Sequence, residues 1–282
     1  MKKTIISCVL FLTAVTAFSQ TPMKTAAEAK LSASDLAVKI ADRILATTTY
    51  EFKNTKTGKT YKSVKNLPLD MNVKVACKYN NWHYTNGVTH IALMELADKT
   101  GAKKYDDYVL KNMNFVFNEG NLDFFKKQYD QAMKNEGWYG VRKLSWHMIF
   151  RGKRLDDNGP MGASLIDLQM KHPNNSFLNY INETAEHLNY GEPRLADGTI
   201  ARIWPHENTI WADDAFMAIS FLARMAKMTG DMSYINDAAN QVIKYHKYLW
   251  CPEKRILYHC YHTDTDEHGV AHWSRANGWV FM

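Results

Sequence analysis

The sequence predicts an all-α protein built from consecutive helical hairpins, and three observations support this fold class. One unit occurs three times: a helix, a Gly or Pro stop, a short connection, an aromatic residue and a second helix. The first helix of each unit is apolar on most faces and the second is polar on one side, which is typical of a buried helix beside an outer one. Segments with the alternating pattern of a β-strand are few.

The helices are expected in the following order. Residues 34–47 have apolar positions at helical spacing after a Ser-Asp start, which predicts a capped amphipathic helix. The polar, turn-rich stretch 51–66 is expected to be a long loop. Gly101 and Gly230 end two of the later helices, because glycine accepts the left-handed cap conformation. The three hairpins are predicted over 87–98 and 105–117, 160–171 and 177–188, and 214–228 and 234–249.

Successive hairpins of this kind suit either an open solenoid or a closed double ring, the (α/α)6 barrel or toroid. A fourth inner helix is expected from about Gly278, close to the last residue of the chain. We therefore expect residues 20–282 to form one (α/α) barrel domain that lacks the C-terminal hairpins of a six-hairpin ring.

The composition is that of a globular protein. The chain has 282 residues, of which 46% are hydrophobic, so bulk disorder is excluded. Its formal net charge of +6 is interpreted as spread along the chain, which does not indicate nucleic-acid binding but suits an anionic substrate. The 8 Trp and 15 Tyr residues favour a binding surface lined by aromatic rings. Beyond residue 19, Cys77, Cys251 and Cys260 form no disulfide framework, and a Cys251–Cys260 bridge or free thiols are both possible.

The first residues have the pattern of a secretory signal peptide. Two lysines precede an apolar run from Ile5 to Phe18 that is short for a membrane span, and Ala17-Phe18-Ser19 is a small-residue cleavage site. We expect a signal peptide over residues 1–19, a periplasmic mature protein and no membrane span.

Each predicted inner helix is preceded by a cluster of aromatic and charged residues. The clusters lie at 81–84, 155–159, 204–214 and 273–279. In a closed ring the N-termini of the inner helices meet at one end, so these side chains would gather there. Aromatic faces bind sugar rings and carboxylates perform acid–base chemistry, which predicts a carbohydrate site. Helix capping is the alternative role for the aspartates in two of these clusters, since they stand where N-caps occur.

The histidines between His259 and His272 are spaced too loosely for a tight metal motif, so a solvated loop is expected there and no metal ion.

Several of these segments together resemble the unsaturated glucuronyl/rhamnogalacturonyl hydrolases of glycoside hydrolase families 105 and 88. The stretch WADDAFM at 211–217, followed by FLAR at 221–224 and TGD at 229–231, is similar to a family motif. So are Tyr258-His259, the WSRANGW segment at 273–279, DNG at 157–159 and the aromatic segment from Trp82 to Gly87. The resemblance covers about residues 34–282 and is closer to family 105.

The resemblance implies an (α/α)6 barrel that removes a Δ4,5-unsaturated uronic acid from the non-reducing end of oligosaccharides made by polysaccharide lyases. It implies that Asp213 protonates C4 of the double bond before water adds at C5, and that Asp157 is the second carboxylate. It further implies that five residues contact the substrate, and that no cofactor takes part. These five are Tyr84, Trp211, His259, Arg275 and Trp279.

One position departs from the family pattern, and other functions stay open. Arg202 stands eleven residues before Asp213, where some family members have a histidine. A polysaccharide lyase or an inverting glycosidase on a similar toroid, or a non-catalytic glycan-binding protein, would share many of these features. The sequence does not choose between rhamnogalacturonan, ulvan-type and glycosaminoglycan fragments as substrate, nor does it fix the oligomeric state.

Overall fold

The computed structural model describes residues 32–152 and 154–282 and divides the chain into two compact units, Met1–Asp42 and Arg43–Met282. Helix α2 (Ala33–Thr47) crosses this boundary and agrees with the predicted helix 34–47. At its start the Asp35 N–H donates to the Ser32 hydroxyl (3.1 Å) and the Ser32 N–H donates to the Asp35 carboxylate (3.2 Å). The predicted signal peptide, residues 1–19, lies outside the described residues. The features below belong to the unit Arg43–Met282.

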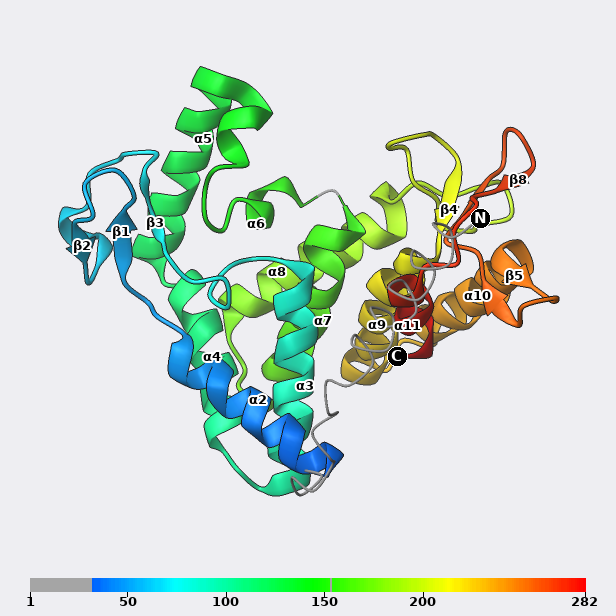
Figure 1. Ribbon diagram of the computed structural model, residues 1–282, viewed down its shortest axis with the longest axis horizontal. Helices are drawn as coiled ribbons and strands as arrows, with labels where there is room; N and C mark the ends of the chain where they lie inside the picture. Colours follow the sequence, from blue (N-terminus) through cyan, green and yellow to red (C-terminus); the bar gives the residue numbers. More distant parts are fainter. Residues whose placement is uncertain (1–31, 153) are drawn as a thin grey trace, which may run out of the picture. The chain divides into compact units, whose positions relative to one another are not determined.

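The three predicted hairpins and the fourth inner helix are present, which confirms the all-α prediction (Figure 1). The first helices of the pairs pack against one another in chain order, and each also packs against its own second helix. The pairs are α3 (Tyr84–Thr100) with α4 (Lys104–Val116), α7 (Leu155–Lys171) with α8 (Asn175–Glu186), and α9 (Ala212–Thr229) with α10 (Met232–Leu249), followed by α11 (Ser274–Phe281).

The helix ends follow from the predicted signals. Gly101 and Gly230 have φ of 71° and 75° and close α3 and α9 in the left-handed conformation. Asp231 caps α10 by accepting from the Ser233 N–H at 2.8 Å. The inner helices begin earlier than predicted, because residues of the aromatic and acidic clusters themselves form the first turns.

Burial separates the inner from the outer helices as predicted. Residues 157–166 of α7 are all buried, whereas α10 buries a single stripe at helical spacing. A side chain at Gly87 would clash with the backbone of Pro160, and one at Gly159 would clash with the carbonyl of Met217. The absence of side chains at these two glycines therefore lets α3, α7 and α9 approach closely.

The prediction of a loop over 51–66 is wrong. Strands β1 (Phe52–Asn54), β2 (Thr60–Tyr61) and β3 (Val73–Val75) form an antiparallel sheet in the order β2-β1-β3, with a short helix η1 (Val64–Asn66) beside it. Phe52 anchors the sheet, because its buried ring contacts Phe115, Phe124 and Phe125. Strands of two or three residues are too short to show an alternating pattern in the sequence.

Helices α5 (Glu119–Val141) and α6 (Met148–Arg151) were also not predicted. They lie between the first and second hairpins along the chain. The kink in α5 falls at Gly137, whose φ of 58° interrupts the helical backbone.

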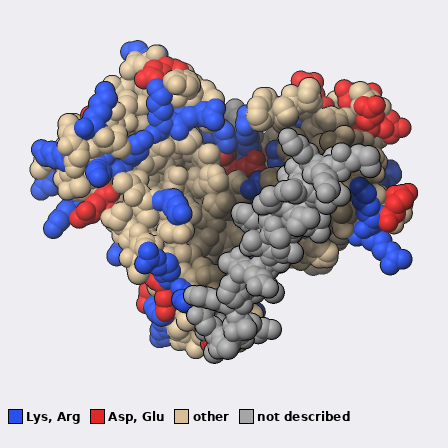
Figure 2. All heavy atoms as spheres, in the orientation of Figure 1, with Lys and Arg blue, Asp and Glu red and all other residues tan. Residues whose placement is uncertain are grey.

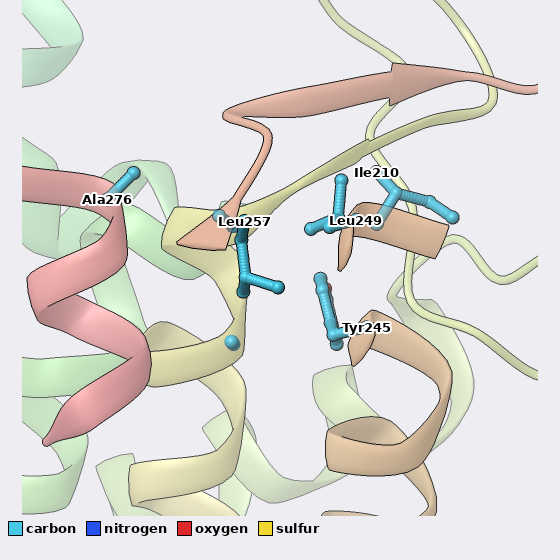
Figure 3. Close-up of a cluster of buried hydrophobic side chains, with 7 residues drawn as sticks. Ile210, Tyr245, Leu249, Leu257 and Ala276 are labelled. Carbon is cyan, nitrogen blue, oxygen red and sulfur yellow. The ribbon is translucent and has the colours of Figure 1, made fainter. Parts of the chain in front are cut away.

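Short strands hold the segment between α10 and α11 against α9. Strand β4 (Thr209–Trp211) pairs with β7 (Cys260–His262), β7 with β8 (Glu267–His268), and β5 (Trp250–Cys251) with β6 (Ile256–Leu257). A π-helical turn, η2 (His187–Gly191), follows α8. A buried apolar cluster joins these strands to α9, α10 and α11, and Figure 3 shows its members Ile210, Tyr245, Leu249, Leu257 and Ala276. Cys77, Cys251 and Cys260 are free thiols.

Candidate active site

Asp213 lies in the first turn of α9 and contacts the imidazole of His259. Strand β4 runs directly into α9, and the Ala212 N–H donates to the His259 carbonyl at 2.9 Å, so both side chains come to the same helix end. Oδ2 of Asp213 is 3.0 Å from Nε2 of His259. Asp213 is 8% exposed, so the pair is largely shielded from bulk water while part of the carboxyl stays accessible to a ligand. An acid and an imidazole in hydrogen-bond contact can exchange or share a proton.

Two tryptophans flank His259. The ring centroids of Trp211 and Trp273 lie 4.8 and 5.0 Å from that of His259, with interplanar angles of 72° and 71°. The guanidinium of Arg275 lies over Trp273, 3.9 Å from the ring centroid. The Asp213 carboxyl, the His259 imidazole and the Arg275 guanidinium therefore lie along two indole rings. This arrangement suits a sugar that carries a carboxylate.

Trp279 of α11 contacts aromatic residues of two other inner helices, α3 and α9. It stacks on Phe216 of α9, with 5.4 Å between centroids, and meets Tyr84 of α3 edge to face at 6.1 Å. Tyr84 and Trp279 thus contact each other, although they are 195 positions apart in the numbering. The structure brings these two predicted residues together on an aromatic surface.

Asn277 fixes the segment that carries His259. Its buried side chain accepts from the Leu257 N–H at 2.8 Å and donates to the Leu257 carbonyl at 3.0 Å. Because Leu257 is two residues before His259, these bonds position the imidazole. We had not predicted this role, although Asn277 lies inside the WSRANGW segment.

Asp157 is enclosed rather than open to a substrate. Both its carboxylate oxygens accept hydrogen bonds from Arg151, and its backbone carbonyl accepts from Nε1 of Trp82 at 2.7 Å. The side chain is 0% exposed. Burial raises the pKa of Asp157, and the Arg151 guanidinium opposes that shift.

The neighbouring Asp156 has the opposite surroundings. Its side chain is 35% exposed and lies 3.6 Å from the guanidinium of Arg202. Arg202 in turn makes two bonds of 2.7 Å to the buried Asp214 and stacks on Trp211 at 4.5 Å. Asp156, Arg202 and Asp214 line a cavity of about 200 Å³ together with the exposed Trp204. Our sequence analysis did not predict a role for Arg202 or Asp156 at the site.

The ionisation of this group is governed by burial and by Arg202. Burial raises the pKa of Asp214 to about 6, and the Arg202 guanidinium opposes the rise. Burial lowers the pKa of Arg202, but the carboxylates of Asp214, Asp156 and Asp213 outweigh it and keep the guanidinium charged.

The four aspartates do not cap their helices, contrary to the alternative reading from the sequence. The N-caps are Arg154 for α7 and Trp211 for α9, and neither makes a side-chain cap bond. The contacts above place the N-terminal ends of α3, α7, α9 and α11 at one end of the bundle. Within residues 32–152 and 154–282, no three His, Cys, Asp or Glu side chains are grouped so that they could hold a metal ion.

Residues 56–282 match the family model of Glycosyl Hydrolase Family 88. The chain belongs to glycosyl hydrolase family 88. A curated relative in Bacillus subtilis (strain 168), the unsaturated rhamnogalacturonyl hydrolase YesR, is 26% identical over an alignment of 169 residues, and the match covers 54% of this chain and 47% of the relative. The chain therefore spans about half the length of that relative.

Solved structures show the same fold. A possible family 105 member from Klebsiella pneumoniae is 15% identical with a TM-score of 0.57, and the match covers 93% of this chain and 60% of that one. A family 105 glycoside hydrolase of C. acetobutylicum is 21% identical with a TM-score of 0.57, covering 89% and 57%. An α-1,6-mannanase from Salegentibacter sp. HEL1_6 is 14% identical with a TM-score of 0.53, covering 89% and 62%. These similarities confirm the predicted (α/α)6 toroid fold.

Proposed function

We propose that this family 88 chain removes a Δ4,5-unsaturated uronic acid from the non-reducing end of oligosaccharides released by polysaccharide lyases. The observation that carries the proposal is the 3.0 Å contact between Asp213 and His259, held between Trp211 and Trp273 with Arg275 beside them. The rhamnogalacturonyl hydrolase relative supports the same reaction class.

In the proposed reaction Asp213 first acts as an acid and then as a base. It gives its proton to C4 of the double bond, which leaves positive charge shared between C5 and the ring oxygen. Water then forms a bond to C5 while the Asp213 carboxylate takes a proton from it. The resulting hemiketal opens and the next sugar leaves. His259 is hydrogen-bonded to the same carboxyl and can orient it for both steps.

The other predicted residues have substrate-binding roles. Arg275 supplies the positive charge for the uronate carboxylate, because a guanidinium can bind a carboxylate through two parallel hydrogen bonds. Trp211, Trp279 and Tyr84 supply aromatic surface for the sugar ring. The family resemblance implies that Asp157 is the second carboxylate, but its enclosure by Arg151 favours a structural contribution to the first turn of α7.

An ordinary glycosidase is the second candidate, because Asp213 and Asp214 are adjacent carboxylates. Inactive variants of the α-1,6-mannanase have two adjacent aspartates replaced. In this chain, however, both oxygens of Asp214 are bonded to Arg202, so one member of the pair is not available to activate water. This geometry favours the hydration reaction.

The test is the loss of ultraviolet absorbance that accompanies saturation of the C4–C5 double bond. We expect the chain to abolish the absorbance of unsaturated disaccharides prepared with lyases. Release of sugar from saturated glycosides without loss of that absorbance would instead support the ordinary glycosidase. A panel of rhamnogalacturonan, ulvan and glycosaminoglycan lyase products would identify the substrate.

We also propose that residues 1–19 direct export to the periplasm, on the basis of the sequence pattern. No helix among the described residues is long and apolar enough to cross a membrane. Cell fractionation with and without residues 1–19 would test the export.

A further inference from the structure

The positive charge of the chain is concentrated in one short region, which corrects the interpretation that it is spread along the sequence. Residues 51–80 hold seven lysines, no arginine and two acidic residues, which gives a net charge of +5. The whole chain has +6, so the remaining residues are almost balanced. The seven lysines are Lys53, Lys56, Lys59, Lys62, Lys65, Lys74 and Lys78. We call the surface that they form the basic face.

The basic face lies on the small sheet and its connections. Lys53 is opposite Lys74 in the register of β1 and β3, while Phe52 and Val75 beside them are buried. The alternation therefore directs the apolar side chains inward and the lysines outward. Figure 2 shows Lys and Arg side chains gathered over the elements that Figure 1 labels β1, β2, β3 and α5.

These lysines are not neutralised by the protein. All except the half-buried Lys74 are exposed, and none of the seven has a carboxylate within ion-pairing distance among the described residues. Asp70 is the one carboxylate in the strands and turns of the sheet, and it is occupied by hydrogen bonds from the side chains of Asn54 and Asn72. Placing Lys53 directly opposite Lys74 costs stability, because like charges on paired positions repel.

Aromatic rings accompany the charges. Lys59 lies over Tyr61 with 5.1 Å between the ammonium and the ring centroid, and Lys78 lies over Tyr79 at 5.3 Å. Both tyrosines are half-buried, so part of each ring faces solvent. Ammonium groups attract carboxylates, and tyrosine rings offer flat surfaces on which sugar rings can pack.

We propose that the basic face binds an anionic polysaccharide and holds the protein on the polymer from which its short substrates are released. The inference rests on the proposed function for the choice of partner, because an unsaturated uronate substrate derives from a polymer rich in uronates. The lysines and tyrosines are carried on a sheet anchored by Phe52, so the surface is fixed without the ligand.

The experiment measures binding of the full chain to polygalacturonate at several salt concentrations. The test variant combines Lys53→Gln, Lys56→Gln, Lys59→Gln and Lys62→Gln, and we expect it to bind about tenfold more weakly or worse at low salt. Its affinity should also depend less steeply on salt, because fewer counterions are exchanged. The matched control replaces four exposed lysines elsewhere, Lys99, Lys103, Lys227 and Lys254, by Gln, and should bind as the unmodified protein does.

A second variant with arginine at the four test positions keeps the charge and should keep the binding. The proposal is overturned if the unmodified chain does not bind polygalacturonate, if the control weakens binding as much as the test variant, or if the arginine variant fails to bind. It is also overturned if vesicles with anionic lipids or duplex DNA bind more tightly than polygalacturonate at equal salt. Binding of polygalacturonate to the basic face does not require the C4–C5 double bond of the substrate. The test variant should therefore still consume an unsaturated disaccharide at the normal rate. Failure of this proposal is therefore distinguishable from failure of the proposed reaction.

Discussion

The first turns of α7 and α9 each carry two adjacent aspartates, and the two pairs are built alike. Asp156 and Asp213 are the second residues of their helices, and Asp157 and Asp214 are the third. In both pairs the third residue is buried and held by an arginine through two bonds.

The two helices differ in what the second residue contacts. Asp213 is bonded to His259, whereas Asp156 lies 3.6 Å from Arg202 and lines a cavity. Successive residues of a helix point about 100° apart, so the two members of each pair have different surroundings. The comparison indicates that Asp156, rather than Asp157, is the counterpart of Asp213.

Replacing Asp213 should have the largest effect. Asp213→Asn keeps the shape of the side chain but cannot transfer a proton, so we expect turnover to fall by about 10²–10⁴-fold or more, with substrate binding retained. Steady-state rates and equilibrium binding of an unsaturated disaccharide would measure this. The matched control is Asp107→Asn, at an exposed aspartate in the first turn of α4, and it should leave turnover and binding unchanged. Normal turnover by Asp213→Asn would mean that the acid is another residue.

Replacing Asp157 should mainly affect folding. Asp157→Asn leaves Arg151 without its buried partner, and breaking such a pair typically costs about 3–5 kcal/mol of unfolding free energy. Denaturant unfolding would show this loss, and the double variant Arg151→Met with Asp157→Leu should recover part of it. If Asp157→Asn unfolds normally but has no activity, the role implied by the family resemblance is correct and the parallel between the two pairs is broken.

The sequence predicts the helical framework well and the site only in part. Gly101, Gly230 and the aromatic residues after them mark the hairpins, because these signals are local. The partners of the aspartates are not local: Arg151 comes from the short helix α6, and Arg202 from a loop twelve residues before Asp214. The sequence alone does not distinguish the neighbouring residues Asp156 and Asp157. In the structure Arg151 binds and encloses Asp157, which leaves Asp156 as the more exposed of the two.

Replacing Asp156 should have an intermediate effect, on activity rather than on stability. We expect Asp156→Asn to lower kcat/KM by about tenfold, since Asp156 lines the cavity beside Arg202 and can accept hydrogen bonds from sugar hydroxyls. The partly exposed ion pair between Asp156 and Arg202 should contribute less than about 1 kcal/mol to the free energy of unfolding. Unchanged kinetics in Asp156→Asn would show that this carboxylate does not meet the substrate and that the resemblance between the pairs is confined to the backbone.

The smallest expected effect is a pH dependence that comes from Asp214. Burial raises its pKa from an ordinary value of 3.8 to about 6 in the folded protein, although Arg202 opposes the shift. Between these two values the folded state binds more protons at this site than the unfolded state. The contribution of Asp214 to stability is therefore largest below about pH 4 and is lost as the pH rises through about 6.

Asp214→Asn removes this titration. The unfolding free energy of the normal protein minus that of Asp214→Asn should thus decrease as the pH rises from about 4 to about 7. Denaturant unfolding of both proteins across that range would measure the difference, and the other titrating groups largely cancel because both proteins contain them. A difference that increases with pH would mean that the Arg202 ion pair outweighs burial and holds the folded pKa of Asp214 below 3.8. In that case the fold would stabilise Asp214 of α9 as an anion. Asp157 of α7 would differ from it, because burial raises the pKa of Asp157 despite the opposing effect of Arg151.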